Sequence, residues 1–195
     1  MIEQTGTERS RADDLLDTIE IPRRLLIGGE WLDAASGDEL PVIDPATGRE
    51  LTRVACAGSA DVDRAVAAAL ATFEEGAWSR MPIAERARAL QRFADTIEAR
   101  IEDLYRIESV NNGRPITETR AQLSRLPEWY RYNAALLLAD RTDVISMPGP
   151  YHTYTTRFPI GVAGILSPFN HPMMIGSKSI APALATGNSV VLKPS

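Results

Sequence analysis

Residues 164–174 read GILSPFNHPMM, and this stretch defines the C-terminal part of the chain. The apolar run VAGIL (162–166) overlaps its start and predicts a buried strand. Pro172 suits the first position of a helix, which the pattern predicts over Met173–Thr186, and Gly187 suits a left-handed helix end. A second apolar run, SVVLK (189–193), predicts another strand.

A strand, a helix and a strand within about 30 residues are typical of a β–α–β unit, whose two strands run parallel with a right-handed crossover. Both strands then end at the same edge of the sheet, where open α/β sheets bind ligands. We therefore expect the loop around Asn170 to lie beside Lys193, although 23 positions separate them.

Asn170 is the candidate catalytic residue. Pro168 and Pro172 stiffen a loop at a helix N-terminus, and an amide held there could donate to an oxyanion that forms only during a reaction. One such donor contributes about 3–4 kcal/mol in the transition state. Two simpler alternatives stand beside this hypothesis. Asn is a preferred N-cap residue, and Lys193 at a strand end could be a solvated charge.

The remainder of the chain predicts an arm, a small β region and several helices. Residues 1–22 are acidic and polar and predict a flexible arm, with one short helix around Asp13 to Ile19. RRLLIGGEWLDA (23–34) and ELPVIDPATGREL (39–51) predict strands joined by turns. A helix capped by Ser59 and ended by Gly76 follows. Its predicted buried stripe consists of Val62, Val66, Leu70 and Phe73.

Two longer helical regions come next. The first begins near Pro82, with one expected break, and stops at Asn112-Gly113 and Pro115. Its predicted buried face comprises Ile83, Ala87, Leu90, Ile97, Ile101, Leu104 and Ile107. The second covers Thr117–Ala139 with a boundary or kink at Pro127. YHTYTTRF (151–158) alternates and predicts a strand with one wet face.

Composition narrows the class of protein. The 195 residues are 44% hydrophobic and 24% charged with a net charge of −5, which argues against nucleic acid or an anionic membrane as partner. A single cysteine, Cys56, excludes an internal disulfide and favours a reducing compartment. With neither a signal peptide nor a membrane span in the sequence, we expect a cytoplasmic location. The isolated His152 and His171 make no metal site.

Residues 159–195, PIGVAGILSPFNHPMMIGSKSIAPALATGNSVVLKPS, resemble the cofactor-domain signature of the NAD(P)-dependent aldehyde dehydrogenases. The resemblance extends back to about residue 23. The Pro-Phe-Asn-x-Pro, Ala-Pro-Ala-Leu-Ala-x-Gly-Asn and Lys-Pro-Ser elements match in order and spacing. Phe169 stands where many members carry Trp. The resemblance implies an α/β fold: an incomplete Rossmann-type parallel sheet with N-terminal helices and an oligomerisation hairpin strand.

The resemblance also implies roles for particular residues. Asn170 would donate its side-chain amide to the oxyanion of a thiohemiacetal, and Lys193 would bond the adenosine ribose of NAD or NADP. Leu166, Ser167, Pro168, Phe169, Asn170, Lys193, Pro194 and Ser195 would bind the cofactor. Residues 23–195 would form a partial cofactor-binding domain, in which 145–160 supply the oligomerisation strand. Members of the family act on aldehydes and are usually homodimers or homotetramers.

The family's nucleophilic cysteine and general-base glutamate lie further along the chain than residue 195, and Cys56 does not match the nucleophile. We therefore expect these residues to be the N-terminal part of a longer enzyme and to be inactive alone. Two alternatives stay open. The parent could be a CoA-acylating or semialdehyde dehydrogenase of the same superfamily, or the chain could be a truncated, non-catalytic binding or oligomerisation module.

Overall fold

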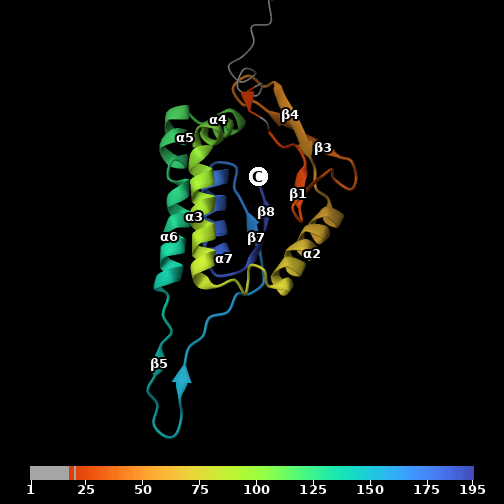
Figure 1. Ribbon diagram of the computed structural model, residues 1–195. Helices are drawn as coiled ribbons and strands as arrows, with labels where there is room; N and C mark the ends of the chain where they lie inside the picture. The colour runs from red at the N-terminus through yellow and green to blue at the C-terminus, as the bar shows by residue number, and fades with distance from the viewer. Residues whose placement is uncertain (1–17, 20) are drawn as a thin grey trace, which may run out of the picture.

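The computed structural model describes residues 18, 19 and 21–195. Most of the helix predicted around Asp13 to Ile19 and most of the arm predicted for residues 1–22 lie outside the described residues. Figure 1 shows a layer of helices on one side of the molecule and a small β region on the other. A parallel strand pair lies between them, and one hairpin projects away from the body.

Two antiparallel hairpins confirm the small β region that the sequence predicts near the N-terminus. Their strands are β1 (Leu25–Ile27), β2 (Glu30–Leu32), β3 (Glu39–Ile43) and β4 (Glu50–Ala55). Gly28 and Gly29 form the first turn, both with positive φ, a conformation that glycine adopts without strain. In the second turn the Asp44 carboxylate accepts hydrogen bonds from the Ala46 N–H and the Thr47 hydroxyl, both at 2.8 Å.

The start of α2 (Ser59–Glu75) differs from the prediction by one residue. Gly58, and not Ser59, is the N-cap. Asp61 in the first turn takes over the capping role, because its carboxylate accepts the Gly58 N–H at 3.0 Å and the Ala35 N–H at 3.1 Å. Asp61 thus supplies the half of a capping box that binds the N–H of the cap residue, and Gly58 has no side chain to supply the other half.

The apolar stripe predicted to be buried on α2 is wrong for three of its four residues. Val62, Val66 and Leu70 are each more than two-fifths exposed. The helix packs through its alanines instead: Ala68 is half-buried, and a Cβ added to Gly28 would lie 3.8 Å from the Ala68 Cβ. Small side chains let the helix approach β1 closely, so the alanine face is covered and the valine face is not.

The helical layer confirms the predicted breaks. Its members are α3 (Ile83–Ala99), α4 (Ile101–Asn112), α5 (Ile116–Leu123) and α6 (Leu126–Ala139). Arg100 separates α3 from α4, and Gly113 ends α4 with φ 76°. Pro127 lies in the first turn of α6, where a missing N–H costs nothing.

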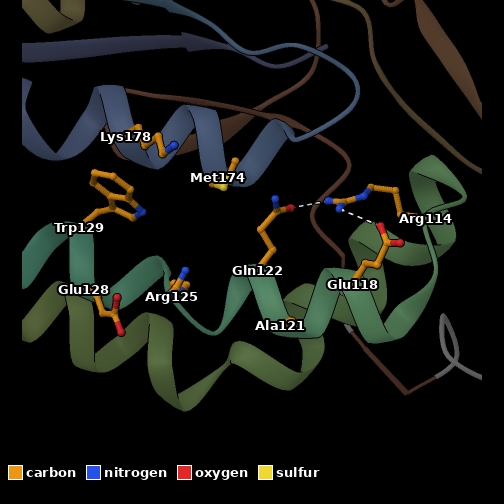
Figure 2. A pocket seen from close by; sticks show the side chains of 9 residues that line it. All are labelled: Arg114, Glu118, Ala121, Gln122, Arg125, Glu128, Trp129, Met174 and Lys178. Atoms are coloured by element: carbon orange, nitrogen blue, oxygen red, sulfur yellow. Dashed lines mark hydrogen bonds and ion pairs between the residues drawn. The ribbon is translucent and has the colours of Figure 1, made fainter.

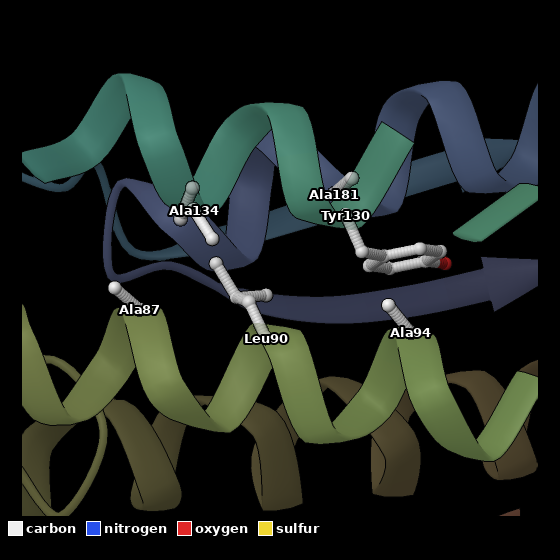
Figure 3. Packing of buried hydrophobic residues seen from close by; sticks show 7 residues of the cluster. Ala87, Leu90, Ala94, Tyr130, Ala134 and Ala181 are labelled. Atoms are coloured by element: carbon white, nitrogen blue, oxygen red, sulfur yellow. The ribbon is translucent and has the colours of Figure 1, made fainter. Parts of the chain in front are cut away.

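The core lies where α3, α6 and α7 (Pro172–Ala185) meet, and Figure 3 shows its side chains between the helices. Its buried members are Ala87, Leu90, Ala94, Tyr130, Ala134, Ala181 and Ala185. The Phe93 and Tyr130 rings meet edge to face at 4.8 Å. Five alanines allow the helices to pack closely. Ala87 and Leu90 are buried as predicted, whereas Ile83 at the start of α3 is exposed.

The projecting hairpin pairs β5 (Val144–Ile145) with β6 (Thr153–Tyr154) in antiparallel register. The strand predicted over residues 151–158 is therefore only two residues long. The side chains of Val144 and Tyr154 are mostly exposed, so little burial holds a longer strand in place.

The β–α–β unit is confirmed. β7 (Val162–Leu166) and β8 (Ser189–Lys193) are parallel, with Val162 opposite Ser189 and Leu166 opposite Lys193. The helix α7 between them begins at Pro172 and ends before Gly187, whose φ is 89°. The fold is α/β, as predicted.

Candidate active site

The carboxyl ends of β7 and β8 lie side by side. The Ser167 N–H donates to the Lys193 carbonyl oxygen at 3.1 Å, one residue beyond the strand pair Leu166 and Lys193. The segments SPFN and KPS are therefore neighbours at one edge, as the spacing predicts. We call residues 167–171, which join β7 to α7, the Asn170 loop.

The Asn170 loop is closed from within by Ser167. The Ser167 hydroxyl donates to the Pro172 carbonyl oxygen at 2.5 Å, and the residue is 8% exposed. This bond occupies the hydroxyl, so Ser167 can line a ligand site through its backbone and Cβ but has no free donor. The serine in this loop is a fixed structural element.

Asn170 itself is exposed and is not the helix cap. The N-cap of α7 is His171, with Pro172 as the first helical residue. The alternative that Asn170 serves only as an N-cap is therefore wrong. Within the described part of the chain, no hydrogen bond involves the Asn170 side chain. Its amide is available to donate to a ligand.

Three residues at the end of α4 contact the Asn170 loop and the first turn of α7. The Glu108 carboxylate accepts the Met173 N–H at 3.3 Å. The Asn112 side-chain amide donates to the Asn170 carbonyl oxygen at 3.5 Å. An Arg114 N–H lies 2.7 Å from His171 Nδ1. Arginine can only donate, so this ring nitrogen accepts and the ring proton is on Nε2. We call Glu108, Asn112 and Arg114 the α4 clamp.

Glu108 is 1% exposed, and one of its carboxylate oxygens has no hydrogen-bond partner among the described residues. Burial raises the pKa of Glu108, while the Met173 N–H and the charge of Arg114 act in the opposite direction. A carboxylate beside the N-terminus of α7 interacts favourably with the positive end of the helix dipole. The start of α7 is thus occupied by the protein's own anion, where many doubly wound folds hold a cofactor phosphate.

The sequence reasoning missed the α4 clamp. Ile107 belongs to the predicted apolar face of this helix. Helical periodicity places the next residue, Glu108, at the flank of that face, where a charged side chain is expected to be solvated. The NNGRP segment (111–115) was the one indication of the clamp in the sequence. It marks the end of a helix, where backbone groups are left without partners in the helix.

The predicted cofactor-binding residues form an open, partly apolar surface. Leu166 and Phe169 are 78% and 77% exposed. Lys193 is exposed and has no ion-pair partner among residues 18, 19 and 21–195. Two exposed apolar side chains beside an unpaired cation fit a ligand that combines flat rings with hydroxyl or phosphate groups, as a dinucleotide does. The residues Pro168, Pro194 and Ser195 on this edge are also exposed.

A groove of about 470 Å³ adjoins the Asn170 loop between α5, α6 and α7, as Figure 2 shows. It is lined by Arg114, Glu118, Ala121, Gln122, Arg125, Glu128, Trp129, Met174 and Lys178. Arg114 links the groove to the loop, since it contacts His171 and also pairs with Glu118 at 3.2 Å. The Lys178 ammonium lies 4.9 Å from the centre of the Trp129 ring.

Other candidate residues lie elsewhere. Cys56 follows β4, and its N–H donates to the Asp38 carbonyl oxygen at 2.8 Å, so it belongs to the β3–β4 sheet. In the described ranges, no group of three or more His, Cys, Asp or Glu side chains could hold a metal ion. None of the helices in these ranges has the length and hydrophobicity that a membrane crossing requires.

The sequence model of the aldehyde dehydrogenase family matches residues 31–195. The chain is 40% identical to phenylacetaldehyde dehydrogenase of Pseudomonas fluorescens, over 92% of this chain and 37% of that protein. It is 36% identical to aldehyde dehydrogenase family 2 member B4, mitochondrial, of Arabidopsis thaliana, over 99% of this chain and 36% of that protein. The chain thus spans about a third of the length of these curated relatives.

Solved structures of aldehyde dehydrogenases also resemble this chain. An indole-3-acetaldehyde dehydrogenase mutant from P. syringae in complex with NAD+ and IAA superposes with a TM-score of 0.90 at 34% identity, covering 94% of this chain and 37% of that one. Betaine aldehyde dehydrogenase from Staphylococcus aureus in complex with NAD+ gives 0.88 at 32% identity, over 94% and 36%. With the family match over most of its length and the parallel strand ends that carry Asn170 and Lys193, the chain belongs to the aldehyde dehydrogenase family.

Proposed function

We propose that this chain is the N-terminal part of an NAD(P)-dependent enzyme that oxidises an aldehyde to a carboxylic acid. One observation carries the proposal. The 3.1 Å bond between the Ser167 N–H and the Lys193 carbonyl oxygen brings the amide of Asn170 and the ammonium of Lys193 to one sheet edge. The NAD+ complexes of the two related structures support a nicotinamide cofactor.

Asn170 acts on the substrate oxygen in this proposal. Attack of a thiolate on an aldehyde places a negative charge on the former carbonyl oxygen, and the amide N–H donates to it. A donor held before the reaction stabilises that charge without reorganisation. The thiolate and the general base would come from residues outside these 195.

The chain's own residues hold the cofactor by contact and charge. The apolar side chains of Leu166 and Phe169 offer contact area, with Pro168 between them. Lys193 offers hydrogen bonds to ribose hydroxyls, with Pro194 and Ser195 beside it. When bound, the nicotinamide supplies the acceptor for the substrate hydride. Because the Ser167 hydroxyl is already bonded, the Ser167→Ala substitution should affect the loop more than cofactor binding.

A fusion tests the proposal. It joins residues 1–195 to the part of the Pseudomonas phenylacetaldehyde dehydrogenase that follows its matching segment. We expect aldehyde-dependent formation of NADH or NADPH by the fusion and none by the 195-residue chain alone. Lys193→Met in the fusion should raise the KM for the cofactor, and Arg88→Met, at an exposed site on α3, should leave it unchanged. Turnover by the chain alone, or equal KM values in both variants, would contradict the proposal.

A carboxylate-bearing aldehyde is the second candidate substrate, in line with a semialdehyde dehydrogenase. The groove beside the Asn170 loop contains two cations, Arg125 and Lys178, that have no ion-pair partner within the described part of the chain. Glu128 on the same wall has no ion-pair partner among the described residues, and Figure 2 shows its side chain directed away from Trp129. In the fusion, Lys178→Met should raise the KM about fivefold for a four-carbon aldehyde with a terminal carboxylate. The KM for butyraldehyde should stay unchanged, and equal effects on both would favour the uncharged substrate.

The β5–β6 hairpin supports a homodimer or homotetramer. It projects from the body and exposes Val144, Ile145 and Tyr154, as an element that pairs with a second subunit would. Sedimentation of the fusion should show a dimer or tetramer, and Val144→Lys should shift it toward the monomer. An unchanged oligomer would place the interface elsewhere. The cytoplasmic location stays a prediction, and the Arabidopsis relative is mitochondrial by name.

A further inference from the structure

Asn170 has no side-chain hydrogen bond of its own within the described chain, so the direction of its amide depends on how firmly the loop backbone is held. Within the loop, only the Ser167–Pro172 bond closes the turn. At its start the loop is also bound to β8 through the Ser167 N–H and the Lys193 carbonyl oxygen. From Asn170 onward the constraints come from the α4 clamp, more than 50 positions earlier in the sequence.

The clamp holds the loop at Asn170 and at the residues that follow it. Asn112 donates to the carbonyl oxygen of Asn170 itself at 3.5 Å. Glu108 accepts the N–H of Met173, three residues further along, at 3.3 Å. Arg114 donates to the ring of His171, which lies between these two points, at 2.7 Å. With the backbone bound at residues 170 and 173 and the ring bound at residue 171, the loop has little freedom to turn the Asn170 side chain.

Glu108 is the costly member of the clamp. A carboxylate that is 1% exposed with one oxygen unpartnered is unfavourable for stability, and an apolar residue of similar size would bury more easily. The Glu108 side chain accepts a hydrogen bond from Met173, which lies beside the loop that carries the candidate catalytic amide.

We propose that Glu108 is a positioning residue for Asn170: by binding the Met173 N–H it fixes the start of α7 and so the direction of the Asn170 amide. The proposal rests on the proposed function for its catalytic meaning, but the positioning itself is a property of this chain and needs neither substrate nor cofactor.

NMR on the 195-residue chain tests the positioning. The variants are Glu108→Gln, which keeps shape and a weaker acceptor, and Glu108→Ala, which removes the acceptor. The matched control is Glu102→Gln, the same change on the exposed face of α4. The readouts are hydrogen exchange at the Met173 amide, ¹⁵N relaxation of the Asn170 side-chain NH₂, and hydrogen exchange at the core amides of Leu90 and Ala134.

We expect Met173 exchange to rise about 5-fold in Glu108→Gln, because a hydrogen bond to a charged acceptor is roughly twice as strong as a neutral one. It should rise about 30-fold in Glu108→Ala. The Asn170 side chain should become more mobile in the same order, while core exchange and the control stay at wild-type values. Unchanged Asn170 relaxation in both variants would overturn the proposal, as would an equal rise at Leu90 and Ala134. Asn170→Ala in the fusion tests the proposed function separately.

Discussion

Arg86 is a buried cation on α3 that binds the end of α7, and its replacement by methionine tests how the helical layer is joined. The Arg86 Nε donates to the Ala185 carbonyl oxygen at 3.0 Å. A second guanidinium nitrogen lies 3.4 Å from each of three carbonyl oxygens in the segment between α2 and α3, those of Trp78, Ser79 and Met81. Arg86→Met keeps most of the volume and removes every one of these contacts.

The expected loss of stability follows from these contacts. A hydrogen bond from a charged group contributes about 1.5–3 kcal/mol, and a buried carbonyl left without a donor costs about 1–3 kcal/mol. The contacts at 3.4 Å add little. Burial lowers the pKa of Arg86, which shows that the cation is partly desolvated, and removing it offsets some of the loss. We expect a decrease of about 2–4 kcal/mol in the free energy of unfolding.

Thermal unfolding followed by circular dichroism is the assay. For a chain of this size the decrease corresponds to a melting temperature lower by about 4–16 °C. Arg88→Met, two positions along α3 and exposed, is the control and should change stability by less than about 0.5 kcal/mol. If both variants melt at the wild-type temperature, Arg86 does not join α3 to α7 in the way described.

Three further outcomes follow from the core, the clamp and the surface. Leu90→Ala, at a site that is 1% exposed, should cost about 2–5 kcal/mol by urea unfolding, whereas Ile83→Ala on the exposed start of α3 should cost less than about 1 kcal/mol. Burial raises the pKa of Glu108 above its usual value near 4.5, so its stabilising effect is complete at lower pH and is lost as pH rises through the raised pKa. The stability of Glu108→Gln relative to wild type should therefore increase from about pH 4 to about pH 8 in urea titrations, and a constant difference would contradict this. Arg131 is exposed and pairs with Asp95 at 2.7 Å, so Arg131→Gln should lower the melting temperature by no more than about 4 °C.

The β–α–β unit could be predicted because its signals are local. Pro172 and Gly187 mark the two ends of a helix, and the apolar runs on either side have the length of strands. Parallel pairing then follows from the short connection, and with it the meeting of the Asn170 loop and Lys193. A glycine after an apolar helical pattern likewise predicted that α4 ends at Gly113 and that α2 ends at Gly76.

The sequence could not predict features that depend on which helices and strands pack against each other. On α2, both the valine stripe and the alanine stripe have helical spacing, and only packing against neighbouring strands decides that alanines such as Ala68 are half-buried while the valines are exposed. Glu108 was missed for the same reason: nothing near it in sequence indicates that α7 begins beside it. Asn170 was expected as either a donor or a cap. The position of His171 one residue later excludes the cap, and the donor role stays a prediction.

The kcat of Asn170→Ala in the fusion tests the central claim most directly. If the Asn170 amide stabilises the oxyanion, its removal lowers kcat by about 10²- to 10³-fold. A kcat that stays within about threefold of the wild-type fusion, less than 1 kcal/mol, would contradict the account, because the strand ends would then carry no donor for the reaction.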